Sequence, residues 1–188
     1  MRPRIGAKER IERAALRLFV ERGVEETSIR DIAKAARVSQ GAMYNHYASK
    51  EELAWALFAE NFSEIGYELR QRANEHDTLE GKLRAMIGYV FERFDRDWLP
   101  VGYTFLVRHH FLARLDRKLG NPYLVFRNVV TTAMRHDEIP RQNPDVVTSL
   151  VIGAVIQVFD TKILGYIKTG LSPLADDVAL ACRRILDG

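Results

Sequence analysis

The chain has 188 residues, of which 47% are hydrophobic and 28% are charged, so it can bury the core of one domain or of two small ones. It contains no uninterrupted apolar run long enough to span a membrane and no signal-peptide pattern near its first residue, so we expect no transmembrane helix and a cytoplasmic location. The single cysteine, Cys182, excludes an internal disulfide framework and a cysteine-type zinc site, and is expected to be a small core residue.

The net charge of +3 is unevenly distributed along the chain. Residues 1–50 contain 11 lysines and arginines against 6 aspartates and glutamates, a net charge of +5, whereas residues 51–188 have a net charge of −2. A local basic surface is what contact with nucleic-acid phosphates requires, although a solvated basic helix face would give the same count.

Apolar residues at helical spacing, separated by glycines and prolines, predict an all-α chain of about nine helices. In the first helix, residues 8–22, the apolar side chains share one face, and Gly23 ends the helix. Two short helices follow, the first starting at a capping-box pattern of Ser28 and Asp31 and the second capped by Ser39. The other helices are expected at residues 50–73, 79–96, 100–117, 122–137, 145–168 and 174–186.

The second short helix is poor in core residues and rich in small and polar ones, as a helix must be if it lies in the major groove of DNA. Amide side chains can read base edges there, and hydroxyl, imidazole and ammonium groups can donate to phosphates. The alternative is a packed three-helix unit in which tyrosine and histidine are half-buried fillers. The expected DNA-contacting residues are Thr27, Ser28, Arg37, Ser39, Gln40, Gly41, Ala42, Tyr44, Asn45, His46 and Lys50.

Residues of fixed type recur at fixed spacing around the two short helices: Phe19, Gly23, Ser28, Ile32, Ala33, Tyr44, His46, Tyr47, Lys50 and Leu53. Over about residues 8–55 this pattern resembles the DNA-binding domain of the tetracycline-repressor (TetR) family. Two departures from the family pattern matter. Tyr47 replaces the usual phenylalanine and adds a hydroxyl, and Arg37 replaces the usual glycine of the turn. If that turn needs a positive φ, Arg37 is strained, and its charge can add a phosphate contact.

The resemblance implies a DNA-binding domain over residues 1–49 and a helical domain over residues 50–188 that binds a small effector and forms a homodimer. In the family, the last two helices of each subunit make a four-helix bundle. Residues 145–168 are apolar nearly all round, which predicts burial on more than one side. One side can serve the subunit's own core and another a partner subunit, whereas in a monomer the helix would be central and fully buried.

Two sets of residues in the larger domain are candidates for an effector pocket. Gln157, Asp160 and Thr161 form a polar stripe within the apolar helix, so we expect them to need partners, more readily from a neighbouring helix than from an effector. Four aromatic residues are the candidates for an apolar lining. These are Trp98, Tyr103, Phe126 and Phe159.

The sequence therefore favours a ligand-responsive transcriptional regulator, most often a repressor in this family. Its expected partners are a palindromic double-stranded DNA operator, a second copy of the chain and an unknown small-molecule effector, with no cofactor, no metal and no membrane. His109 and His110 are adjacent and therefore diverge on a helix, which argues against a metal site. The alternative is an architectural DNA-binding protein without an effector. We find no nucleophile–base pair and no phosphate-cradling loop, so we expect no enzyme.

Overall fold

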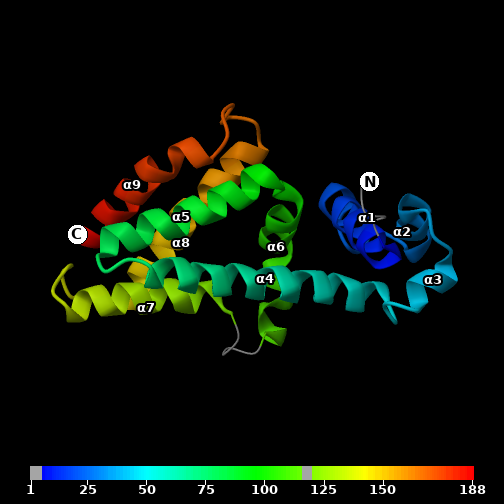
Figure 1. Ribbon diagram of the computed structural model, residues 1–188, viewed down its shortest axis with the longest axis horizontal. Coiled ribbons are helices and arrows are strands. Elements are labelled where there is room, and N and C mark those ends of the chain that lie inside the picture. Colours follow the sequence, from blue (N-terminus) through cyan, green and yellow to red (C-terminus); the bar gives the residue numbers. More distant parts are fainter. Residues whose placement is uncertain (1–5, 116–119) are drawn as a thin grey trace. The chain divides into compact units, whose positions relative to one another are not determined.

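The computed structural model of the protein describes residues 6–115 and 120–188. These residues form nine α-helices and two short 3₁₀ helices, with no strand among them, as predicted (Figure 1). The helices are α1 (Ala7–Arg22), α2 (Ile29–Ala36), α3 (Gln40–Tyr44), α4 (Lys50–Asn74), α5 (Leu79–Arg96), α6 (Trp98–Phe111), η1 (Leu112–Arg114), α7 (Pro122–Arg135), α8 (Pro144–Ile163), η2 (Ser172–Leu174) and α9 (Ala175–Asp187).

Two helices differ from their predicted ranges by more than two residues at one end. The helix expected to reach residue 168 ends at Ile163, because Gly165 adopts a φ of 79° that turns the chain out of the helix. The helix expected over 100–117 begins at Trp98 and ends at Phe111. Pro100 is tolerated because the first turn needs no backbone donor. Residues 116 and 117 of that prediction lie outside the described part of the chain.

The described residues pack as two compact units. The first holds the residues up to Asn61 together with Leu99–Leu115, and the second holds Phe62–Trp98 and the residues from Gly120 onward. Helix α4 contributes its first half to one unit and its second half to the other. The predicted functional boundary between residues 49 and 50 is a different kind of boundary and stays a prediction.

The core of the first unit joins α1 and the first half of α4 to α6. Tyr103 of α6 is fully buried, and its ring stacks on Phe19 of α1 with centroids 5.7 Å apart. Its hydroxyl donates to the carbonyl oxygen of Ala54 in α4 at 2.8 Å. The prediction that Tyr103 lines an effector pocket is therefore wrong, because the ring is enclosed by the core and the hydroxyl is already bonded.

The core of the second unit is built around Phe159 of α8. Its ring lies 5.5 Å from the ring of Phe91 and 5.0 Å from that of Phe94, both on α5. Phe126 of α7 is also buried, with 5% of its surface exposed. Phe126 and Phe159, expected as pocket residues, are thus core residues in this conformation. Cys182 is fully buried as predicted, and burial raises the pKa of its thiol to about 11.

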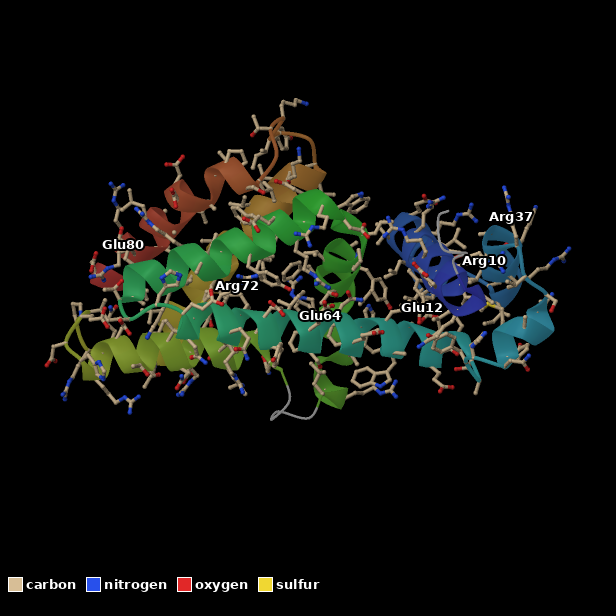
Figure 2. The ribbon with its side chains drawn as sticks, in the orientation of Figure 1. Arg10, Glu12, Arg37, Glu64, Arg72 and Glu80 are labelled. Carbon is tan, nitrogen blue, oxygen red and sulfur yellow. The ribbon has the colours of Figure 1, made fainter. Side chains whose placement is uncertain are left out.

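Helix α4 is tied to its neighbours in the second unit in two ways. Arg93 of α5 donates to Glu64 of α4 at 2.6 Å, and this bond lowers the pKa of the Glu64 carboxyl (Figure 2). Two residues along α4, the main chain at Gly66 touches the main chain at Gly120, just before α7. A Cβ atom on Gly66 would overlap the carbonyl group of Gly120, so only glycine allows this approach.

We predict that Gly66→Ala destabilises the fold by about 1–3 kcal/mol, because the added methyl group must force α4 and the start of α7 apart. The free energy of unfolding from urea titration measures the effect. Gly88→Ala is the matched control, since a Cβ on Gly88 of α5 would meet no atom within 4 Å. That variant should be neutral or more stable by about 0.5–1 kcal/mol, as expected for a helical glycine replaced by alanine. Equal effects of the two substitutions would contradict the close approach.

Candidate nucleic-acid interface

Helix α2 starts at the predicted capping box. The Asp31 amide donates to the Ser28 hydroxyl oxygen at 3.1 Å, and the Ser28 amide donates to the Asp31 carboxylate at 3.2 Å. Hydrogen bonds from the hydroxyl and the amide of Ser28 lower the pKa of the Asp31 carboxyl. Two backbone amides at the start of α2, those of Ser28 and Asp31, therefore have side-chain acceptors within the same four residues. This capping fixes where the first helix of the pair begins.

The turn between α2 and α3 passes through Arg37, which has φ 54° and ψ 49°. The sequence prediction of a position that favours glycine is confirmed. A left-handed conformation costs a residue with a Cβ atom about 1–2 kcal/mol, and here the amides of Arg37 and Val38 offset it by closing the end of α2. The Arg37 side chain is exposed and points away from the helices (Figure 2).

Helix α3 presents the predicted polar face. The Ala42 amide donates to the Ser39 hydroxyl oxygen at 3.1 Å, which caps the helix, and the fully buried Met43 holds it on the core. Ala42 is half-buried. The exposed residues of α3 and the turn after it are Gln40, Gly41, Tyr44, Asn45 and His46. The structure thus leaves these predicted base-reading residues accessible to solvent, and their contact with DNA stays a prediction.

Tyr47 lies after the end of α3. It is buried, with 7% of its surface exposed, and its hydroxyl donates to Glu12 of α1 at 2.5 Å. Glu12 also pairs with Lys8 at 3.6 Å. Glu12 was missed in the sequence; the signal for it was the hydroxyl that Tyr47 adds to a usual phenylalanine position.

The structure corrects the prediction that Thr27 contacts DNA. It is 2% exposed, and its hydroxyl donates to the Gly23 carbonyl oxygen at 2.8 Å, with the Leu18 carbonyl oxygen 3.4 Å away. The predicted phosphate contact of this hydroxyl is therefore wrong, because the side chain closes the loop after α1 from inside.

Lys50 is held in place by the same loop. Its ammonium group donates to the Glu25 carbonyl oxygen at 3.1 Å, and its phosphate contact stays a prediction. One hollow of about 480 Å³ lies beside α3, and its lining includes Ser28, Tyr44 and Lys50. Three carboxylates line the same hollow and oppose an anion there: Glu25, Glu26 and Glu51.

The structure also corrects the prediction that the polar stripe of α8 has partners on a neighbouring helix. Gln157 and Asp160 are exposed, and the Thr161 hydroxyl donates to the Gln157 carbonyl oxygen of its own helix at 2.7 Å. These side chains therefore do not lie buried between helices of the described chain. The stripe falls on the side of α8 that this single chain leaves uncovered.

Trp98 is 40% exposed and lines a hollow of about 540 Å³ in the second unit. The polar residues of that hollow are already bonded. Asp95 accepts the amides of Leu171 and Ser172 at 2.9 and 2.8 Å, and Lys162 donates to the carbonyl oxygens of Ile167 and Thr169. The hollow therefore owes its shape to the loop after α8, and Trp98 offers an apolar surface beside it.

Two further features of the described residues concern metal binding and membrane insertion. No group of three His, Cys, Asp or Glu side chains in residues 6–115 and 120–188 converges as a set of metal ligands. Within the same residues, α8 is long and apolar enough to cross a membrane by length and composition, a test that core helices of soluble proteins also pass.

We predict that Tyr47→Phe destabilises the protein by about 1–2 kcal/mol near neutral pH, because it removes a half-buried hydrogen bond to a carboxylate. Burial, followed by the bond to Glu12, raises the pKa of Tyr47 above its ordinary value of 10.0. The unfolded chain then loses its tyrosine proton first, so this contribution is present below pH 10.0 and declines above it. Urea unfolding across that range should show a smaller alkaline loss in the variant.

The control is Tyr44→Phe, because Tyr44 is 56% exposed. Its stability should stay within about 0.5 kcal/mol of the wild type. A Tyr47→Phe protein as stable as this control at every pH would contradict the role given to the Glu12 bond.

Residues 11–57 match the profile of a family described as bacterial regulatory proteins, tetR family. An uncharacterized HTH-type transcriptional regulator of Bacillus subtilis, YerO, is 37% identical over 92 residues, and the match covers 46% of this chain but only 31% of that relative. A bacterial regulatory protein in the tetR family from Rhodococcus shares the fold with a TM-score of 0.78 at 16% identity, over 96% of both chains. The transcriptional regulator FadR from Bacillus subtilis, in complex with stearoyl-CoA, has a TM-score of 0.74 at 17% identity over 93% of this chain and 97% of its own. The helix-turn-helix segment, residues 11–57, therefore matches the tetR family of bacterial regulatory proteins, and the described residues share the all-helical fold of a tetR-family structure.

Proposed function

We propose that the protein is a transcriptional regulator, a repressor in its default state, that reads DNA with α3. The observation that carries the proposal is the solvent-facing set of polar and small side chains on α3, held by the Ser39 cap and the buried Met43. Residues 1–49 would form the DNA-binding domain, and their 10 lysines and arginines against 6 aspartates and glutamates, a net charge of +4, favour phosphate contact. The matched relatives are named as transcriptional regulators, and we propose no catalytic activity.

The proposal includes a homodimer. Along α8, Val146 and Leu150 are 53% and 54% exposed, and Gly153 continues the same stripe at helical spacing. Leu180 of α9 is 43% exposed. Apolar side chains in such a row are costly in water, which favours a second copy as their cover. Two identical reading helices would then match a palindromic operator.

A small molecule bound in residues 50–188 is proposed to change the DNA affinity. The effector would act through its differential affinity for two arrangements of the DNA-binding domains, with α4 as the connecting helix. The structure of the neighbour FadR contains stearoyl-CoA, which supports the proposal that a helical domain of this fold binds a small molecule. The identity of the effector here stays open, and Trp98 is the predicted contact that lines a hollow.

Selection from a random duplex library should enrich a sequence with two inverted half-sites. Gln40→Ala should relax the preference at one position of each half-site, with about 1–3 kcal/mol of discrimination lost, because it removes an amide from a base edge. Arg37→Asn keeps a residue that tolerates positive φ, and should weaken binding to all sequences and lower the salt slope by about one. Binding without an enriched sequence would instead favour the architectural function.

Leu150→Glu should convert the dimer to a monomer in sedimentation experiments, because it places a charge in the proposed interface. Tyr67→Glu is the control, since Tyr67 of α4 is 59% exposed and lies outside the apolar stripe. It should leave the dimer intact. A Leu150→Glu protein that sediments like the wild type would remove α8 from the interface.

A further inference from the structure

The second unit contains a groove that none of the predicted site residues lines. It has a volume of about 410 Å³ and is formed by the end of α4, the start of α5 and one face of α7. Its lining includes two cationic side chains and no carboxylate. The lining residues are Arg70, Ala73, Asn74, Lys82, Leu124, Val125, Asn128, Val129 and Thr132.

The two cations of the groove differ from their neighbours in charge pairing. Arg72 lies within 3.9 Å of Glu68 and 3.8 Å of Glu75, and can be followed on α4 in Figure 2. Arg84 of α5 pairs with Glu80 at 3.0 Å. Among the described residues, no ion pair involves either groove cation, Arg70 or Lys82.

The missing counter-charge matters most for Lys82, which is half-buried. An anion bound in the groove would form charge-assisted hydrogen bonds with an ammonium group that has no ion-pair partner among the described residues. Arg135 lies beside the groove and donates to the Thr132 hydroxyl oxygen at 2.9 Å. It adds positive potential and leaves the hydroxyl hydrogen available for a ligand.

Part of the groove lining is apolar. Val125 and Val129 are 5% and 6% exposed, so they form a floor that is already dehydrated around its edges. Leu124 is 40% exposed, which is unusual for a leucine that borders a concave surface. A ligand that covered this leucine would gain the free energy of removing apolar surface from water.

We propose that this groove binds a small carboxylate with an aliphatic tail, with the charged end between Arg70 and Lys82 and the tail over Leu124, Val125 and Val129. The amides of Asn74 and Asn128 and the hydroxyl of Thr132 supply further donors to the carboxylate. The site is separate from the hollow beside Trp98. It does not depend on the proposed function, because the binding can be measured on the protein without DNA.

The test is isothermal titration of the full chain with octanoate, with 1-octanol and inorganic phosphate as probes of the tail alone and of the charge alone. Octanoate should bind, and Arg70→Gln and Lys82→Gln should each weaken it about tenfold or more, as expected for loss of a charge-assisted hydrogen bond. Arg84→Gln is the matched control. It removes the same kind of charge from a side chain paired with Glu80, and should bind octanoate as the wild type does.

Three results would overturn the proposal. One is octanoate affinity that is unchanged in both groove variants, or reduced equally by Arg84→Gln. Another is 1-octanol binding as tightly as octanoate, which would remove the anionic role of the two cations. The third is inorganic phosphate binding as tightly as octanoate, which would remove the apolar role of α7. Circular dichroism of each variant establishes that it is folded, and a failure here leaves the DNA-binding proposal standing.

Discussion

The contact of two main chains at Gly66 and Gly120 is the constraint on which the second unit depends. It brings the start of α7 onto the middle of α4 with no side chain between them. Further along the two helices, the side chains of Arg70 and Leu124 line one groove. The same contact thus sets the packing of α4 against the start of α7, the two helices that both line this groove. Because α4 also carries the Ala54 carbonyl bonded by Tyr103, the first unit depends on the same helix.

The proposed DNA-reading helix, α3, is held in place mainly by residues close to it in the sequence. With five residues, α3 is too short to be stable alone, so its start is set by the Ser39 cap and its depth by the buried Met43. The left-handed Arg37 turn costs conformational energy and keeps a cation beside the reading surface. The bond from Tyr47 to Glu12 fastens the segment after α3 onto α1. Each device acts within a few residues of the polar side chains that it positions.

Helix α8 serves two opposed needs. Its buried face, with Phe159, closes the aromatic core of its own subunit, whereas Val146 and Leu150 lie on a face that one chain leaves in water. This explains why the helix is apolar nearly all round without being central. The exposed polar residues Gln157 and Asp160 continue that open face, and in the proposed dimer they would lie beside the partner subunit.

The sequence by itself determined the helices, their caps and the polar face of α3, because capping boxes, glycine turns and helical periodicity act over a few neighbouring residues. The box at Ser28 was predictable for that reason, whereas the positive φ at Arg37 was suggested only by the glycine usual at this position in the resembled family. Only the tertiary structure decided which side chains are enclosed. Thr27 turned inward onto the carbonyl oxygens of Gly23 and Leu18, and Tyr103 entered the core, where its hydroxyl bonds a carbonyl oxygen 49 residues away along the chain. The groove beside Arg70 was equally invisible in the sequence, since burial and charge pairing depend on helices that meet only after folding.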